Sequence, residues 1–300
     1  MMTEATPSPP LVPLLAHRDA ALGDIRLHYV ETGPADGPVV LLLHGFPEFW
    51  YSWRHQLAAL STAGYRVVAP DLRGYNASER PSGVAQYQIE TLVADVVHLI
   101  AHLGLERVAL VGHDWGGFVA WWVAMLHPDV VTRLAILNCP HPAHGLTMLR
   151  DPAQLRRSWY MFFFQLPEIP EATFAADDFR MLRTTFREDP VRRGAFTDDD
   201  IDRYVAAFSA DRGRGAMNYY RAYLRRDPRA LGRKFRAIDL PVLVLWGTQD
   251  RYLGIDYARP PERWVPNAEV AFIDDASHWV QVDRPEAVSA RLRDFLAPMI

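Results

Sequence analysis

The stretch VALVGHDWGG, residues 108–117, decides the architecture of this chain. Its first four residues are apolar and predict a buried strand, and a helical pattern begins directly after it. Gly112 and Gly116 lie two residues before and two residues after Asp114, where small residues permit a sharp turn from strand to helix that exposes the central side chain. The stretch therefore predicts a strand–turn–helix unit of an α/β protein, with a carboxylate at the turn.

The sequence on either side repeats this alternation of strand and helix. Continuously apolar runs predict strands covered on both faces, and an alternating run predicts a half-buried strand before them. The apolar runs are 39–43, 67–69, 108–111, 134–137 and 242–245, and the alternating run is 25–31. Helical patterns occupy 53–63, 88–103 and 116–127, and the chain closes with a strand at 268–273 and a helix at 285–296. This order predicts a doubly wound, mostly parallel sheet of about eight strands.

The alternation stops after Pro140 and resumes at Leu240 and Pro241. The residues between are rich in aromatic side chains and arginine and have mostly helical patterns. We therefore predict an α/β core formed by residues 1–140 and 234–300, with an inserted helical lid at 141–233. The prolines among residues 7–13 predict an irregular start.

The composition excludes several classes of protein. The chain has 300 residues, of which 49% are hydrophobic and 23% charged, so it can bury a substantial core. A net charge of −4 gives no basic surface for nucleic acid, and no apolar run is long enough to span a membrane. Cys139 is the single cysteine, and no His or Cys spacing indicates a metal. The first ten residues lack a secretory signal pattern, so we expect a cytoplasmic protein. We expect no metal and no cofactor.

The carboxylate of Asp114 indicates the type of chemistry. The N-terminus of a helix favours the ionised form of an acid. A serine that attacked a saturated carbon would form a stable ether, whereas a carboxylate forms an ester that water can cleave in a second step. Asp114 therefore favours alkyl transfer over acyl transfer. The corresponding substrates are epoxides and alkyl halides.

A base and an acid are expected to accompany this nucleophile. His278 follows the strand at 268–273 and is the only histidine after His144, so it is the candidate base. Asp250 follows the strand at 242–245 and is the candidate that orients His278 and stabilises its imidazolium. The other strand end, after 134–137, carries Asn138, which cannot supply a negative charge.

The turn His44-Gly45-Phe46-Pro47 follows the strand at 39–43. A turn at this strand end can direct a backbone N–H toward the nucleophile. We predict that the N–H groups of Phe46 and Trp115 form an oxyanion hole. Whether Pro47 is cis is left open.

Several longer motifs resemble those of soluble epoxide hydrolases, a group with the α/β-hydrolase fold. They are HGFPE (44–48), WYSWR (50–54), DLRGY (71–75), GHDWG (112–116) and SHWVQ (277–281), the last followed by DRP (283–285). The resemblance covers nearly the whole chain. It implies two lid tyrosines that hold and protonate the epoxide oxygen. Tyr160 matches the first, and Tyr220 the second, with Tyr219 as its rival.

The resemblance implies an epoxide hydrolase that converts a small apolar epoxide and water to a vicinal diol. The reaction would pass through a hydroxyalkyl ester on Asp114, which water activated by His278 then hydrolyses. We expect His44, Pro47, Trp115, Phe164 and Trp279 to line the substrate pocket. The apolar character follows from three aromatic-rich segments that the fold brings around one cavity. The protein would be a monomer or a homodimer.

Two other functions remain open on the sequence. A haloalkane or haloacid dehalogenase would use the same nucleophile, base and fold. However, haloalkane dehalogenases usually have asparagine where this chain has Phe46, and fluoroacetate dehalogenases have arginine where it has Trp115. The third possibility is a hydrolase-fold binding protein that has lost turnover. Such proteins often lack a member of the catalytic triad, whereas Asp114, Asp250 and His278 are all present here.

Overall fold

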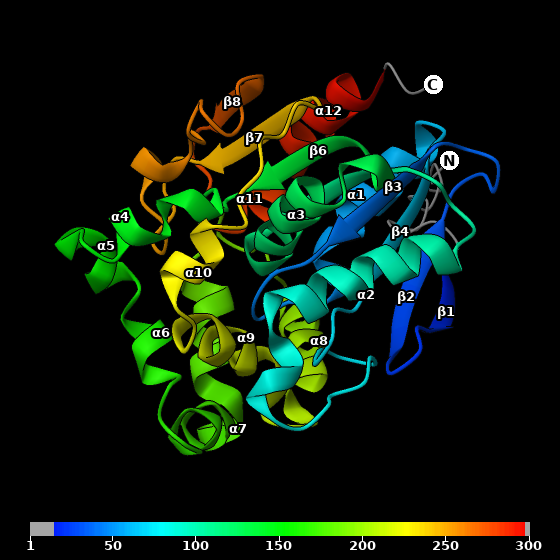
Figure 1. Ribbon diagram of the computed structural model, residues 1–300. Helices are drawn as coiled ribbons and strands as arrows, with labels where there is room; N and C mark the ends of the chain where they lie inside the picture. Colours follow the sequence, from blue (N-terminus) through cyan, green and yellow to red (C-terminus); the bar gives the residue numbers. More distant parts are fainter. Residues whose placement is uncertain (1–14, 298–300) are drawn as a thin grey trace, which may run out of the picture.

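The computed structural model describes residues 15–297, and its centre is an eight-stranded sheet (Figure 1). The strand order is β1-β2-β4-β3-β5-β6-β7-β8, in which β1 and β2 are antiparallel to their neighbours and the other pairs are parallel. The bounds are β1 Ala16–Ala21, β2 Arg26–Thr32, β3 Val39–Leu43, β4 Arg66–Pro70, β5 Val108–His113, β6 Val131–Leu137, β7 Val242–Gly247 and β8 Ala268–Ile273. The mostly parallel, doubly wound α/β-hydrolase fold is confirmed.

Helices cover both faces of the sheet, and each face has its own apolar core. On one face α1 (Arg54–Thr62), α11 (Val280–Asp283) and α12 (Pro285–Leu296) bury Leu57, Val280 and Leu292 against the strands. On the other face lie α2 (Ile89–His102) and α3 (Asp114–Leu126). This double cover explains why β3 and β5 are buried along their whole length.

The segment between β6 and β7 is helical and is called the insertion here, residues 141–233. Its helices are α4 Gly145–Met148, α5 Pro152–Arg157, α6 Trp159–Phe163, α7 Ile169–Glu188, α8 Asp198–Ser209, α9 Arg214–Leu224 and α10 Pro228–Gly232. Helix α7 is interrupted by non-helical backbone at residues 176–179. Short 3₁₀ helices are η1 Trp50–Trp53, η2 Val84–Tyr87, η3 Pro128–Val130, η4 Pro142–His144 and η5 Ile255–Tyr257.

The insertion lies beside the carboxyl ends of the parallel strands (Figure 1). Because these ends meet at one edge of the sheet, the loops after β3, β5, β7 and β8 come together there. Those loops carry Phe46, Asp114, Asp250 and His278. The fold thus places the predicted chemistry between the sheet and the insertion.

The N-terminal part differs from the sequence analysis at one strand and leaves one prediction untested. Strand β1 was not predicted, because AHRDAA has few β-forming residues, and the structure pairs it with β2 at the sheet edge. The irregular start predicted from the prolines among residues 7–13 lies outside the described residues.

Candidate active site

The turn between β5 and α3 holds Asp114 in a left-handed conformation, with φ of 48°. Glycines make the turn possible. A Cβ on Gly112 would lie 2.4 Å from the carbonyl oxygen of Gly116, and one on Gly116 would lie 2.2 Å from that of Leu43. Since no side chain fits these gaps, glycine at 112 and 116 lets α3 start directly against the strands. Asp114 is thereby fixed at the end of β5.

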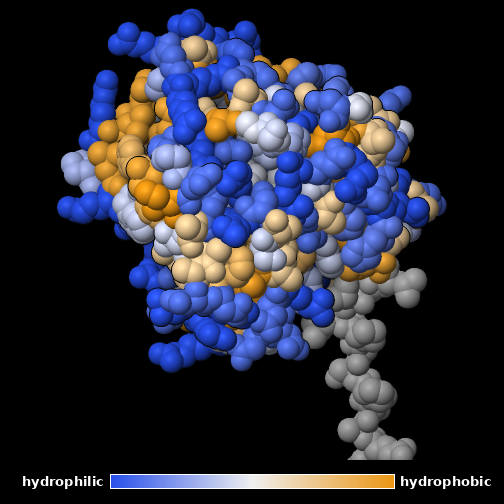
Figure 2. Space-filling model, turned by 90° about the horizontal axis from the view of Figure 1, so that it is seen from below, coloured by the Kyte–Doolittle hydropathy of each residue, from blue (hydrophilic) through white to orange (hydrophobic). Residues whose placement is uncertain are grey.

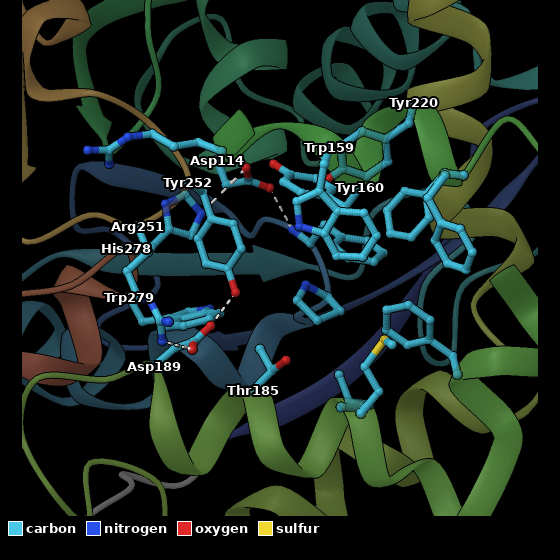
Figure 3. A pocket seen from close by; sticks show the side chains of 18 of the residues that line it. Asp114, Trp159, Tyr160, Thr185, Asp189, Tyr220, Arg251, Tyr252, His278 and Trp279 are labelled. Atoms are coloured by element: carbon cyan, nitrogen blue, oxygen red, sulfur yellow. Dashed lines mark hydrogen bonds and ion pairs between the residues drawn. The ribbon is translucent and has the colours of Figure 1, made fainter. Parts of the chain in front are cut away.

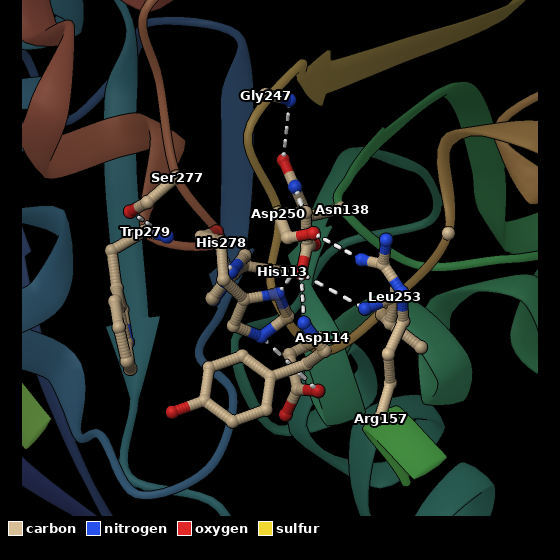
Figure 4. Close-up of polar contacts among 12 residues, drawn as sticks. His113, Asp114, Asn138, Arg157, Gly247, Asp250, Leu253, Ser277, His278 and Trp279 are labelled. Carbon is tan, nitrogen blue, oxygen red and sulfur yellow. Dashed lines mark hydrogen bonds and ion pairs between the residues drawn. The ribbon is translucent and has the colours of Figure 1, made fainter. Parts of the chain in front are cut away.

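His278 lies between two carboxylates (Figure 4). Its Nδ1 is 2.8 Å from Oδ2 of Asp250, and its Nε2 is 3.5 Å from Oδ2 of Asp114. The first distance is a hydrogen bond, and the second is a looser ion-pair contact. The three residues come from three different loops, and the structure brings them together in the predicted order.

Asp250 is held by groups that leave it no freedom to rotate. Its Oδ1 accepts the backbone N–H groups of Tyr252 at 2.8 Å and Leu253 at 2.9 Å. Its Oδ2 accepts the side-chain amide of Asn138 at 2.7 Å as well as the His278 ring. Asn138, which follows β6, in turn accepts the N–H of Gly247 through its Oδ1 at 3.0 Å. Asn138 cannot supply a negative charge, but its amide holds the carboxylate of Asp250 in place.

The turn after β3 also contacts Asp114. The N–H of Phe46 donates to Oδ1 of Asp114 at 2.8 Å, and the Phe46–Pro47 peptide bond is cis. Trp115 follows Asp114 in the first turn of α3, where backbone N–H groups have no partner within the helix. These are the two positions predicted for an oxyanion hole.

Electrostatics in the triad favour a charged resting state. Burial disfavours the charge on His278, but Asp250 and Asp114 outweigh burial and raise the pKa of His278 to about 10. Burial also favours neutral acids, yet the hydrogen bond and charge of His278 hold the pKa of Asp114 below its usual value. The pKa of Asp250 is lowered in the same way. Near neutral pH the triad therefore consists of an imidazolium between two carboxylates.

A cavity of about 370 Å³ opens in front of Asp114 and His278 (Figure 3). Its apolar wall includes Phe46, Phe164 and Phe174, whose rings contact one another. Pro47 and Trp279 also line it, as predicted from the sequence. The cavity is thus an aromatic pocket with a carboxylate at its base.

Tyr160 from α6 and Tyr220 from α9 line the same cavity. Their ring centroids are 5.7 Å apart. Burial raises the pKa of both phenols, and the charge of Asp114 adds to the rise in each, while a hydrogen bond from Tyr220 acts in the opposite direction on Tyr160. Both phenols therefore remain protonated close to the Asp114 carboxylate.

Tyr219 has a different environment from its neighbour. Its hydroxyl donates to the backbone carbonyl of Arg73 at 2.8 Å, and its ring packs against Tyr75 and Tyr87. It does not line the Asp114 cavity. Consecutive residues of a helix point about 100° apart, so Tyr220 faces Asp114 while Tyr219 does not.

The prediction for His44 needs correction. Its side chain is fully buried and is not among the residues that line the cavity. Nε2 of His44 accepts the N–H of Leu72 at 3.0 Å, and Nδ1 lies 2.9 Å from the carbonyl oxygen of Gly45. The imidazole therefore joins two loops beneath the site.

Trp115, also predicted to line the substrate pocket, is not among the residues that line the 370 Å³ cavity. Trp115 lines a separate space of about 90 Å³ that also borders Asp114, Tyr160 and Tyr220.

A buried network below the triad was not predicted. Nδ1 of His113 lies 2.7 Å from Oε2 of Glu48, and its Nε2 lies 2.9 Å from the carbonyl oxygen of His278. The same carboxylate accepts the N–H of Gly45 at 3.2 Å, and Gln281 donates to its other oxygen at 3.0 Å. The network connects the Phe46 turn, the turn that holds Asp114 and the His278 loop. Each residue lies in a motif quoted above.

Asp283 connects the His278 loop to the insertion and was also missed. Its side chain is fully buried, and Oδ2 accepts the N–H of Ser277 at 2.7 Å. The two oxygens also accept the N–H groups of Val191 at 3.3 Å and Arg192 at 3.0 Å, between α7 and α8. Three backbone donors therefore hold this carboxylate without an ion pair to a cation within the described residues.

The cavity entrance carries polar residues that the sequence did not single out. Tyr252 donates its hydroxyl to Asp189, which also pairs with Arg251, and all three line the cavity. The side chain of Arg157 donates to the backbone carbonyl of Asp250 at 2.7 Å. Arg251 and Tyr252 directly follow Asp250 on the loop after β7. Their place in the sequence next to Asp250 could have predicted that they lie near the cavity.

Residues 15–297 contain no group of three or more His, Cys, Asp or Glu side chains arranged to hold a metal ion. Within the same residues, no helix has the length and apolar character needed to cross a membrane.

Comparison with known proteins adds independent findings. A family model described as alpha/beta hydrolase fold matches residues 38–285. The chain is 40% identical to Epoxide hydrolase 2 of Caenorhabditis elegans, over 97% of this chain and 82% of that protein. It is 41% identical to AB hydrolase superfamily protein YfhM of Bacillus subtilis, over 91% and 94%. The crystal structure of a Bacillus megaterium epoxide hydrolase with an inhibitor is similar, with a TM-score of 0.86, 34% identity, and coverage of 93% of this chain and 100% of that one.

Proposed function

The chain belongs to the α/β-hydrolase fold family and is an epoxide hydrolase, and from this premise we propose the residues and steps that perform the reaction. The observation that carries the proposal is one cavity shared by the Asp114 carboxylate, the His278 ring and the phenols of Tyr160 and Tyr220. A nucleophile, a base and two proton donors therefore face a single bound molecule.

In the first step Asp114 attacks one carbon of the epoxide. Its Oδ1 is engaged by the N–H of Phe46, so Oδ2 is the oxygen that forms the new bond. The carbon–oxygen bond of the ring breaks, and its electron pair goes to the epoxide oxygen. Oδ1 becomes the carbonyl oxygen of the resulting ester.

Tyr160 and Tyr220 act on the departing oxygen. Each phenol can donate a hydrogen bond to the epoxide, and one of them transfers its proton to the developing alkoxide. Burial and the charge of Asp114 keep the pKa of both above its usual value, which keeps both protonated until the alkoxide forms. The products of this step are a hydroxyalkyl ester of Asp114 and the phenolate of the tyrosine that gave up its proton.

In the second step His278 removes a proton from water, which attacks Cγ of Asp114. The charge that develops on Oδ1 is stabilised by the N–H groups of Phe46 and Trp115. Collapse of the intermediate expels the diol oxygen, which takes the proton from His278. Asp250 holds the ring through Nδ1 and balances its positive charge.

The elevated pKa of His278 is compatible with this role because esterification removes a charge. In the free enzyme two carboxylates stabilise the imidazolium. Once Asp114 becomes a neutral ester only Asp250 remains, and the pKa of His278 falls. The ring can then give its proton to the phenolate left by the first step and act as the base in the second. When the ester is cleaved, the proton of the regenerated Asp114 carboxyl returns to His278 and restores the free enzyme.

The surroundings support further parts of the proposal. Residues 141–233 act as a lid because they supply Tyr160, Tyr220 and Phe164 to the cavity of the α/β core. The aromatic wall favours an apolar epoxide. The chemistry is complete within one chain, whether it works as a monomer or a homodimer. A cytoplasmic location is supported by Cys139, a buried free thiol.

A single-turnover reaction in ¹⁸O-labelled water tests the covalent route. With enzyme in excess over styrene oxide, the label should enter Asp114 and the diol should contain none, because its new oxygen comes from the carboxylate. Tryptic peptides and diol would be measured by mass spectrometry, with Asp114→Asn as the inactive control. Label in the diol after one turnover would reject the ester mechanism. 1-Bromobutane should release no bromide above background, since the phenols are suited to an alkoxide.

A further inference from the structure

Exposed apolar side chains are concentrated on one part of the insertion. Among the described residues, nine large hydrophobic side chains are exposed, and seven of them lie between residues 146 and 181. Four form what we call the α6–α7 patch: Trp159 is 57% exposed, Phe162 48%, Leu166 42% and Ile169 52%. In Figure 2 apolar surface gathers on the left of the molecule, the side on which Figure 1 places α4 to α6. A contiguous patch of this kind marks a surface that contacts a partner or a membrane.

The patch adjoins the entrance of the Asp114 cavity. Trp159 belongs to both, because its ring also lines the cavity, and so do the side chains of Arg156 and Arg157 just before it. Whatever covers the patch must therefore sit at the cavity entrance. A second copy of the chain seated there would obstruct the site of each protomer, whereas a lipid layer would not, because an apolar epoxide can pass through it.

Charge on the same segment also favours lipid. Residues 145–170 contain Arg150, Arg156 and Arg157, and none of them has a carboxylate within ion-pair distance among the described residues. The two acids of the segment have partners, since Asp151 accepts the hydroxyl of Tyr257 and Glu168 lies 3.8 Å from Arg214. Self-association about a two-fold axis would bring uncompensated arginines together. Anionic headgroups would neutralise them.

We propose that this face of the insertion docks on an anionic lipid surface. Trp159, Phe162 and Ile169 enter the boundary between headgroups and acyl chains, while Arg150 and Arg156 contact the headgroups. An exposed tryptophan beside arginines suits such a boundary, where one part of the side chain is apolar and the other is hydrated. The cavity entrance then faces lipid. The docking itself does not depend on the proposed function. The further statement that docking supplies the site with lipid-dissolved epoxide does rest on the proposed function.

Vesicle sedimentation tests the docking. The full chain would be mixed with vesicles of phosphatidylcholine alone, or of phosphatidylcholine and phosphatidylglycerol at a ratio of about 3:1, at low and high salt. We expect at least about tenfold more binding to the anionic vesicles, and a loss of most binding in high salt. Equal binding to both vesicles, or binding to neither, would overturn the proposal.

Variants separate the patch from the rest of the surface. The double substitution Phe162→Ser with Ile169→Ser should weaken vesicle binding about tenfold, and Arg150→Gln should weaken it only for anionic vesicles. Phe272→Ser, an exposed side chain on β8, is the matched control and should bind like the wild type. None of these residues lines the Asp114 cavity, so hydrolysis of styrene oxide in buffer should be unchanged, which shows that each variant is folded.

Two results would contradict the assignment of lipid as the occupant. Unchanged vesicle binding by the double variant would exclude the patch. A dimer in analytical ultracentrifugation that the double variant dissociates would assign the patch to a second copy of the chain. Binding by a protein that does not hydrolyse styrene oxide would instead leave the docking intact and reject the proposed function.

Discussion

The substitution Asp114→Asn should move the titration of His278 toward neutral pH. Asparagine has nearly the shape of aspartate but no charge, so it mimics the neutral side chain of the ester state. Nε2 of His278 is 3.5 Å from Oδ2 of Asp114. At an effective dielectric constant of about 20, a charge at this distance stabilises the imidazolium by about 5 kcal/mol, which corresponds to about 3.5 pH units.

The wild-type pKa of His278 is raised to about 10, so it should titrate far above an ordinary histidine. The same ring in Asp114→Asn should titrate about 3.5 pH units lower, because only Asp250 remains beside it. An NMR titration that follows the Cε1 signal of His278 measures the pKa in the wild type and in Asp114→Asn. The signal is assigned to His278 because it is missing from the spectrum of His278→Gln.

Asp275→Asn is the matched control for this experiment. Asp275 lies on the His278 loop, but its side chain is 68% exposed, so water and salt screen its charge. We expect a change of about 0.3 pH units or less. A wild-type His278 that titrates near its ordinary pKa would refute the reasoning. Equal shifts in Asp114→Asn and Asp275→Asn would refute it as well.

Further substitutions test the remaining roles. In His278→Gln, ester formation should continue while its hydrolysis stops, so mass spectrometry should find alkylated protein; fast steady-state turnover would contradict this. Tyr160→Phe and Tyr220→Phe should each slow ester formation about 10²-fold in rapid-quench experiments, because each removes a proton donor, and rates within twofold of the wild type would exclude that role. Tyr219→Phe should leave the rate constants within about twofold but lower the free energy of unfolding by about 1 kcal/mol, since it loses its hydrogen bond to Arg73; a urea titration measures the loss, and a catalytic defect at unchanged stability would contradict the assignment.

The core of the fold could be predicted because its strands are buried on both faces. Continuous apolar runs identified β3 and β7, and the glycine spacing around Asp114 located the elbow. The pattern failed where a strand meets solvent. Strand β6 begins at Val131, earlier than predicted, because Thr132 and Arg133 interrupt the apolar run. Strand β1 is exposed along most of its length, and its sequence AHRDAA contains few β-forming residues, so no pattern indicated it.

The site divided in a similar way between what spacing determines and what packing determines. Asp114, Asp250 and His278 each follow a strand, so the parallel sheet alone brings them to one edge. Whether Tyr219 or Tyr220 faces them depends on the rotation of α9 about its axis, and the sequence pattern does not define that rotation. We expected His44 to line the pocket, but packing turns its ring toward Leu72 instead.

The three backbone N–H groups that donate to Asp283 come from the insertion and from the His278 loop, two segments far apart in the sequence. If the 190–197 loop opens, the buried carboxylate loses the N–H groups of Val191 and Arg192 and is left with that of Ser277. Opening of this loop therefore also weakens the support of the base loop next to it. The two segments should exchange amide hydrogens as one cooperative unit, with matching protection factors. Catalytic activity then reports on the local stability of the insertion as well as on the chemistry of the triad.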